Sequence, residues 1–264
     1  MVVENREGAG GVVGSAHVAR AVPDGQTLLF TAHPPFVSAP LLNRPPAYDP
    51  LTSFIPVARL GSVPMVLITS SRSPFTTFQQ MREFVLANPD KATYAHSGVG
   101  SPGQLFTELI KQAARLPLLR DIPYKSPGQA MIDAIAGTVL VSMASYPAAQ
   151  PHLKAGSIRM LATGGLQRLK EHGDVPTLAE ALGRADFEAG VWYGVLAPAA
   201  TPPERVARLV EAFGKAHGSA SVAAFMARSS IAPQLMTPAE FAAALKRDNE
   251  VARALIDAAR LGER

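Results

Sequence analysis

The fold of this chain is decided by the β-like run Ala92-Thr93-Tyr94-Ala95-His96 and the residues Ser101-Pro102-Gly103-Gln104 that follow it. The same unit recurs as Asp121-Ile122-Pro123-Tyr124 followed by Ser126-Pro127-Gly128-Gln129. In both copies serine is a preferred N-cap, proline suits the first helical position, and glutamine comes three residues after the cap. Each unit therefore predicts a strand that leads directly into a helix.

A helix N-terminus attracts anions because its first backbone N–H groups lack partners and carry partial positive charge. Helices that start at the carboxyl ends of neighbouring parallel strands point at one crevice. We expect the Ser101 and Ser126 N–H groups to be free to meet carboxylate oxygens. A third strand-to-helix turn is predicted at Ala144-Ser145-Tyr146-Pro147. These turns together predict a site for a small anion.

The composition excludes several classes of protein. The chain has 264 residues, of which 47% are hydrophobic and 17% charged, so it can bury a sizeable core. Its net charge of +4 comes from dispersed basic residues, which argues against nucleic-acid binding. It contains no cysteine and six scattered histidines, so we expect neither thiol chemistry nor a metal site. No apolar run reaches the length of a membrane span, and from the first residues we expect no signal peptide.

A glycine pattern, Gly98-Val99-Gly100-Ser101-Pro102-Gly103, matches the dinucleotide fingerprint G-x-G-x-x-G. The acidic residue expected at the end of the next strand is absent, because that strand ends in Tyr124-Lys125. A nucleotide is therefore disfavoured, and we predict no cofactor.

Strand-like and helix-like runs alternate along the chain, which is typical of an α/β protein with a parallel sheet. Two separate apolar runs are expected at 55–61 and 65–69, and capping boxes at Thr201-Pro202-Pro203-Glu204 and Thr237-Pro238-Ala239-Glu240 predict C-terminal helices. We expect two lobes, the first built from 1–64 with 190–264 and the second from 65–189. Ligands of such proteins bind in the cleft between domains.

Several motifs occur in an order that resembles one family. They are Val2-Val3-Glu4-Asn5-Arg6, Pro23-Asp24-Gly25, Tyr48-Asp49-Pro50, Pro123-Tyr124-Lys125, Pro151-His152-Leu153-Lys154-Ala155-Gly156, Asp174-Val175-Pro176-Thr177 and Trp192-Tyr193-Gly194-Val195-Leu196-Ala197-Pro198. From Val2 to about Arg260 the chain is similar to the Bug-type receptors, the solute-binding subunits of tripartite tricarboxylate transporters. The resemblance implies an α/β, two-lobed periplasmic-binding-protein architecture of the Venus-flytrap type (type II) that closes on a small carboxylate. It also implies a periplasmic location and delivery to membrane transporter subunits rather than catalysis.

The chain departs from this family in three places. Relatives have a signal peptide, a first strand, a glycine-rich loop and a first helix before the motif at Val2, so we expect the first lobe to lack its first strand and helix. Many relatives carry an aspartate where this chain has Ala144, and that carboxylate suits a ligand ammonium. Without this carboxylate an amino acid is disfavoured as the ligand, because its buried ammonium would have no partner. The favoured ligand is a di- or tricarboxylate or an aromatic acid. Gln104 replaces a common histidine, which keeps hydrogen bonding without a charge.

These arguments predict a carboxylate site with no catalytic and no metal residue. The expected ligand contacts are Thr31, Ala32, His33, Ser97, Gly98, Ser101, Gln104, Lys125, Ser126, Ala144, Ser145, Tyr146 and Trp192. Two alternatives stay open for single residues: His96 is either a cleft residue or a structural histidine, and Trp192 either lines the cleft or packs the domain junction. Two alternatives stay open for the function: an α/β enzyme acting on an anionic substrate, and a degenerate sensor or scaffold that transports nothing.

Overall fold

The computed structural model describes residues 2–6, 8, 11–42, 45–185 and 187–259. The chain divides into two compact units, of which unit 1 comprises Met1–Ser62 with Trp192–Arg264 and unit 2 comprises Val63–Val191. Strands β2 (Phe54–Ser70) and β7 (Gly190–Pro198) contribute residues to both units. None of the helices in the described ranges is long and apolar enough to cross a membrane.

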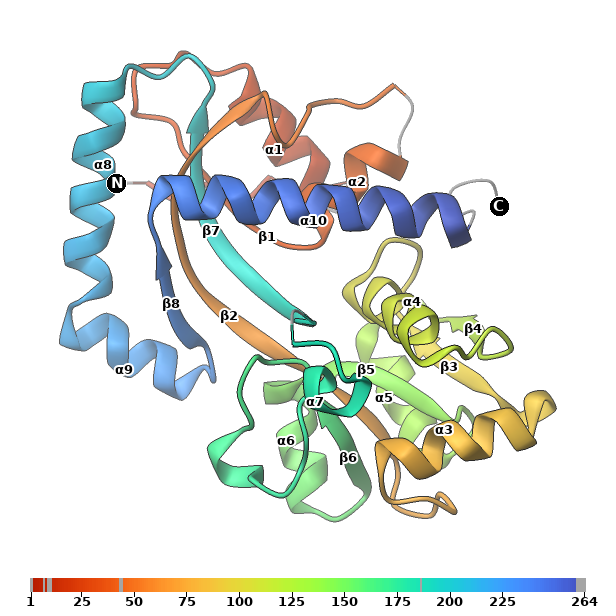
Figure 1. Ribbon diagram of the computed structural model, residues 1–264. Coiled ribbons are helices and arrows are strands. Elements are labelled where there is room, and N and C mark those ends of the chain that lie inside the picture. Colours follow the sequence, from red (N-terminus) through yellow and green to blue (C-terminus); the bar gives the residue numbers. More distant parts are fainter. Residues whose placement is uncertain (1, 7, 9–10, 43–44, 186, 260–264) are drawn as a thin grey trace. The chain divides into compact units, whose positions relative to one another are not determined.

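The sheet of unit 1 has the strand order β1–β7–β2–β8 (Figure 1). β1 (Leu29–Ala32) pairs antiparallel with β7, so that Thr31 lies opposite Gly194. β8 (Ala232–Met236) pairs antiparallel with β2. The helices described in this unit are α1 (Val12–Ala19), α2 (Pro35–Leu42), α8 (Pro203–His217), α9 (Ala220–Arg228) and α10 (Pro238–Ala259).

Side chains from helices cover both faces of β7. Successive residues of a strand point to opposite faces, so neighbouring residues of β7 belong to different clusters. Trp192 and Leu196 pack in a cluster with side chains of α1, α2 and α10. Val195 and Ala197 belong to a second cluster, against which residues of α8 pack. The near-continuous apolar sequence of β7 follows from this two-sided burial.

The sheet of unit 2 has the strand order β6–β2–β5–β3–β4. β3 (Thr93–His96) is parallel to β4 (Arg120–Pro123) on one side and to β5 (Val141–Ser145) on the other. β2 runs antiparallel to β5 and to β6 (Ile158–Thr163). The helices described here are α3 (Phe78–Ala87), η2 (Pro89–Lys91), α4 (Pro102–Ala114), α5 (Pro127–Ala136), α6 (Tyr146–Lys154), η3 (Lys170–His172) and α7 (Leu178–Leu182).

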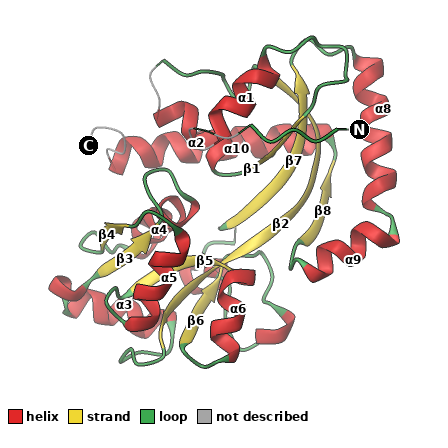
Figure 2. Cartoon of the chain, turned by 180° about the vertical axis from the view of Figure 1, so that it is seen from behind, coloured by secondary structure: helices red, strands yellow, loops and turns green. Residues whose placement is uncertain are grey.

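Helices cover both faces of this sheet as well. Leu67 and Tyr94 pack with side chains of α3, α4 and α7, whereas Val66, Ile68 and Ala95 pack with those of α5 and α6. Figure 2 shows α5 and α6 in front of the sheet, on the face that is turned away in Figure 1. The alternation of neighbouring residues between the two clusters confirms the α/β class that the sequence predicts.

Three expectations about the fold are wrong. The runs at 55–61 and 65–69 form one strand, because β2 continues through Pro64 and finds different antiparallel partners along its length. The sheets are mixed rather than parallel, since β2 opposes its neighbours. Thr201 is not a cap: the N-cap of α8 is Pro202, and the Thr201 hydroxyl instead donates to the carbonyl oxygen of Pro198 at 2.7 Å.

Candidate functional site

Three turns of unit 2 lie at one edge of its sheet. β3 is flanked by β4 and β5, and all three strands point the same way, so the loops that follow them emerge at their shared carboxyl edge. Each loop leads into a helix, namely α4, α5 and α6. The predicted ligand residues of this unit occupy these three loops and helix starts.

The helices at this edge begin as the sequence predicts. Ser101 and Ser126 are the N-caps of α4 and α5, and their hydroxyls accept the N–H groups of Gln104 and Gln129 at 3.4 and 3.3 Å. Ser145 precedes α6. The first turns of these helices all lie in the described part of the chain and carry no acidic side chain. Among the other described helices, α7, α8 and α10 carry a glutamate in the first turn, whereas α1, α2, α3 and α9 also carry no acidic side chain there. What distinguishes the edge of β3–β5 is that three such helix starts, with no first-turn carboxylate to neutralise them, lie at one sheet edge.

The first turn, at residues 97–101, is stabilised by local hydrogen bonds. Gly98 and Gly100 have φ values of +112° and +76°, in the region that favours glycine. The buried side-chain oxygen of Gln104 accepts the Gly100 N–H at 2.8 Å. The Ser101 N–H donates to the carbonyl oxygen of Gly98 at 3.2 Å, so the expectation that this group is free is wrong in this structure. Ser97 and Gly98 are half-buried at the start of the turn.

The second turn offers an exposed cation beside a helix start. Lys125 is exposed, and Ser126 behind it is half-buried. Within the described residues, the Ser126 N–H has no hydrogen-bond partner. An unpaired N–H at a helix start, next to a lysine, is suited to an anionic oxygen.

The third turn presents Ala144 and Ser145, both half-buried, whereas the side chain of Tyr146 turns into the core. The Tyr146 hydroxyl donates to Glu171 at 2.7 Å. Burial, followed by this hydrogen bond, raises the pKa of Tyr146. The same bond, with one from Gln150, lowers the pKa of Glu171. The phenol is therefore engaged within unit 2, and only the backbone of Tyr146 stays a candidate for ligand contact.

We predict that Tyr146→Phe raises the pKa of Glu171 toward its ordinary value, because the carboxylate loses the hydrogen bond that lowers its pKa most. A lowered pKa in the folded state stabilises the protein above the unfolded-state value, and this stabilisation is lost as the pH falls through the folded-state pKa. The variant should therefore show less loss of stability in that acidic window. NMR titration of the Glu171 carboxyl carbon measures the shift, with Tyr193→Phe as the control. An unchanged Glu171 pKa in Tyr146→Phe would contradict the assignment.

The predicted residues of unit 1 lie in the region of Trp192, which is one of them. Trp192 is 2% exposed, and its N–H donates to Asp248 of α10 at 2.9 Å. His33 stacks on it with a centroid separation of 5.6 Å, and the His33 N–H donates to the Trp192 carbonyl oxygen. The His33 ring nitrogen Nε2 lies 4.0 Å from the Asp248 carboxylate. Thr31 and Ala32 are half-buried in β1 beside this group.

Two acidic residues of these regions were missed by the sequence reasoning. Asp248 is 56 positions from Trp192, and no local motif links the two. Asp121 opens the second predicted strand, and its carboxylate lies 3.4 Å from the Nε2 atom of His96. His96 itself is buried, which supports the structural alternative for this residue. The signal that could have found both acids is pairing between distant segments, which a single sequence does not show.

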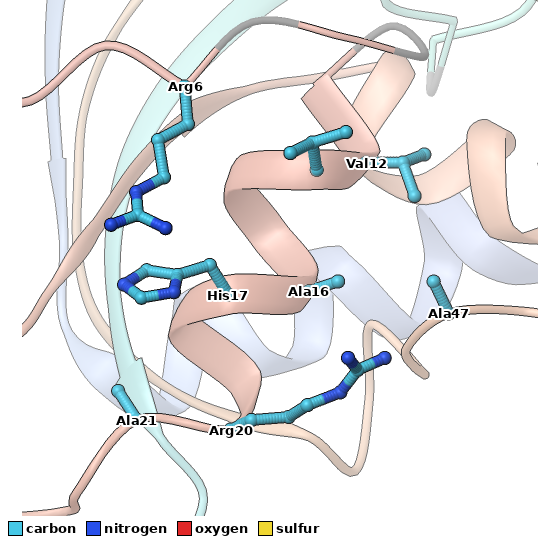
Figure 3. Close-up of a pocket in the computed structure, with 8 residues that line it drawn as sticks. Arg6, Val12, Ala16, His17, Arg20, Ala21 and Ala47 are labelled. Atoms are coloured by element: carbon cyan, nitrogen blue, oxygen red, sulfur yellow. The ribbon is translucent and has the colours of Figure 1, made fainter.

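A pocket of about 450 Å³ lies in unit 1 beside α1 (Figure 3). Its lining is apolar with three basic side chains, and consists of Arg6, Val12, Val13, Ala16, His17, Arg20, Ala21 and Ala47. Arg6 points toward His17 in Figure 3 and is held by Glu4 at 2.9 Å. None of the predicted ligand residues lines this pocket. In the described ranges no three acidic or histidine side chains are grouped to hold a metal ion.

Comparisons with known proteins identify the family. The model of the tripartite tricarboxylate transporter family receptors, TctC, matches residues 1–261. Protein BugT of Bordetella pertussis is 34% identical over 243 residues, which cover 90% of this chain and 73% of BugT. The structure of the periplasmic binding protein BugD matches with a TM-score of 0.76 at 30% identity, covering 98% of this chain and 87% of BugD.

A structure from R. palustris, solved with adipate, matches with a TM-score of 0.78 at 29% identity, covering 98% of this chain and 86% of the other. The family model spans nearly the whole sequence, and these relatives agree with it in both sequence and fold. The chain belongs to the TctC family of tripartite tricarboxylate transporter receptors.

Proposed function

We propose that this protein is an extracytoplasmic receptor that captures a small organic carboxylate at the carboxyl edge of β3, β4 and β5. The observation that carries the proposal is the set of three helix starts at this edge, whose first turns carry no acidic side chain. Such ends hold anions through backbone N–H groups and the helix dipole. A family neighbour solved with adipate supports a carboxylate as the ligand class.

The residues proposed to bind the ligand differ in what they offer. Lys125 supplies a charge, and Ser126 a free N–H, while Ser97, Gly98 and Ser145 lie half-buried at the same edge. The predicted residues of unit 1, Thr31 to His33 with Trp192, remain part of the proposal through the family resemblance. Ala144 offers no carboxylate for a ligand ammonium, which favours a dicarboxylate over an amino acid.

Isothermal titration calorimetry with adipate, a tricarboxylate, an aromatic acid and glutamate tests the ligand class. We expect the carboxylates to bind more tightly than glutamate, with affinities that EDTA does not change. After prolonged incubation with the protein, NMR should show that the recovered adipate is chemically unchanged. A receptor releases its ligand unchanged, whereas an enzyme would convert it. Preferred binding of glutamate, or conversion of the ligand, would overturn the proposal.

We predict that Ala144→Asp weakens adipate binding by at least about tenfold, because like charges at a desolvated site repel by more than 1 kcal/mol. The matched control is Ala144→Asn, which has nearly the same size without the charge and should retain most of the affinity. Calorimetric titration of both variants measures the difference. Equal affinities for adipate in the two variants would show that residue 144 does not face the ligand.

The periplasmic location and the transporter partnership are the finer parts of the proposal. They rest on the family to which the chain belongs and on the similarity to the periplasmic binding protein BugD. Reconstituted membrane subunits of such a transporter should take up the carboxylate only when this receptor is added. Uptake at the same rate without the receptor would exclude the partnership.

A further inference from the structure

The pocket beside α1 in unit 1 (Figure 3) shares no residue with the proposed carboxylate site. Its volume of about 450 Å³ is in the range of small-molecule sites in proteins. One wall is the helix itself, while Arg6 lines the pocket from the segment before α1 and Ala47 from the loop after α2. The size and the separate lining make this pocket a candidate site for a second ligand.

The sequence of α1 explains the composition of this wall. Val12, Ala16 and the C-cap residue Arg20 follow one another at four-residue spacing, so they lie on one face of the helix. Val13 and His17 form a second row beside them for the same reason. In both rows the apolar residues come first and the basic residue last. The wall is therefore apolar along the start of α1 and basic at its end.

The apolar part of the lining is only partly covered by the protein. Val12 and Ala16 pack against the core and are 9% and 8% exposed, whereas Val13 is 48% exposed. Ala21 and Ala47 are half-buried. An aliphatic chain in the pocket would cover Val13 and the two alanines. Removal of this apolar surface from water favours binding of such a chain.

The basic part of the lining has no acidic counterpart among the described lining residues. Arg6 is paired with Glu4 at 2.9 Å, and its guanidinium points toward His17 in Figure 3. Within the described ranges, the side chains of His17 and Arg20 have no hydrogen-bond or ion-pair partner. Both are exposed at the end of α1. They are therefore available to an anionic oxygen, which an arginine binds with two parallel hydrogen bonds.

We propose that this pocket binds an amphiphilic anion, with its aliphatic chain against Val13 and its carboxylate held by Arg20 and His17. The inference does not rest on the proposed function, because the two sites differ in residues and in chemistry. Helix starts at the edge of β3–β5 suit a compact carboxylate, whereas the pocket joins side-chain cations to an apolar wall. A dicarboxylate such as adipate would place its second charge against this wall, which is unfavourable. The pocket therefore prefers a monocarboxylate with a long chain.

Calorimetry with decanoate, below the concentration at which it forms micelles, tests the site. We expect one decanoate per chain and an affinity for hexanoate at least about tenfold lower, because each buried CH₂ group contributes about fourfold. Decyltrimethylammonium has the same chain with the opposite charge, and it should also bind at least about tenfold more weakly. The affinity for decanoate should be the same with and without saturating adipate. Equal affinity for the anionic and cationic chains, or displacement of decanoate by adipate, would overturn the proposal.

Two variants test the residues that carry the argument. Arg20→Gln and Val13→Asp should each lower the affinity for decanoate by at least about tenfold, because one loses the cation and the other repels the anion. Arg228→Gln is the matched control, since it removes the same charge from an exposed position on α9 outside the pocket. All three proteins should bind adipate as the wild type does. Wild-type affinity for decanoate in both pocket variants would overturn the proposal.

Anionic lipid carries the same chemistry as a free long-chain carboxylate, and sedimentation with phosphatidylglycerol vesicles distinguishes the two sources. Co-sedimentation that Arg20→Gln abolishes assigns the pocket to a lipid, whereas decanoate binding without co-sedimentation assigns it to the free acid. NMR locates the ligand, because the amides of Ala16, Ala21 and Ala47 should shift with decanoate. If these amides stay unchanged, or if light scattering shows a dimer that Val13→Asp dissociates, the pocket does not hold an amphiphilic anion and the proposal fails.

Discussion

Replacing Gly164 with alanine is expected to lower the free energy of unfolding of unit 2 by at least about 3 kcal/mol, because the new methyl group has no space. A Cβ atom at this position would overlap the carbonyl oxygen of Ala189 and lie 2.8 Å from its carbonyl carbon. That carbonyl oxygen accepts the Met65 N–H at 3.1 Å, and the Ala189 N–H donates to Gly164 at 2.8 Å. The Gly164 N–H in turn donates to Met65 at 2.7 Å. Relief of the overlap would break these buried hydrogen bonds.

Urea unfolding followed by circular dichroism measures this loss. Gly173→Ala is the matched control, because Gly173 has an ordinary φ of −65° and no heavy atom near the position of a Cβ. We expect its free energy of unfolding to stay within about 0.5 kcal/mol of the wild type. A Gly164→Ala protein as stable as Gly173→Ala would mean that the backbone of Ala189 is not held as these hydrogen bonds indicate.

Replacing Trp192 with alanine should destabilise unit 1 by about 3–5 kcal/mol, the usual cost of removing a buried tryptophan. The ring is 2% exposed and packs edge-on against Phe241 with centroids 5.0 Å apart. Its N–H is held by Asp248, and His33 stacks on its face. The substitution therefore leaves a cavity and also removes the partners of two polar side chains.

Trp192→Phe separates packing from the hydrogen bond, because it keeps an aromatic ring against Phe241 and loses the N–H that binds Asp248. Its expected cost is about 1–2 kcal/mol. Trp192 is the single tryptophan of the chain, so unfolding has to be followed by circular dichroism or calorimetry rather than by tryptophan fluorescence. A loss of less than about 1 kcal/mol in Trp192→Ala would assign this residue to a loosely packed surface instead of the core.

Features encoded within a few residues could be predicted from the sequence. Ser101 and Ser126 cap their helices as expected, and Thr237 with Glu240 forms the predicted reciprocal pair before α10. Each of these bonds joins residues three positions apart, so the local chain determines them. The same reasoning failed at Thr201, where the double proline moves the N-cap to Pro202 and the hydroxyl binds the chain before it.

The placement of the three turns was predictable from the sequence, and their hydrogen bonding was less so. The order of strands and helices was enough to expect the three turns at one sheet edge. The sequence could not show that the Ser101 N–H donates to the Gly98 carbonyl oxygen, or that the Tyr146 hydroxyl donates to Glu171. Both bonds depend on the conformation of loops, in which several acceptors compete for one donor.

By itself the sequence determined the α/β class, the helix starts at the site and, through its ordered motifs, the family. The tertiary structure decided that β2 is one strand across Pro64, that Asp248 holds Trp192, and that Asp121 lies beside His96. Strand pairing and burial bring together groups that are 25 to 56 positions apart in these side-chain pairs. Such contacts arise from packing of the whole core, whereas a cap needs only the neighbouring turn of the chain.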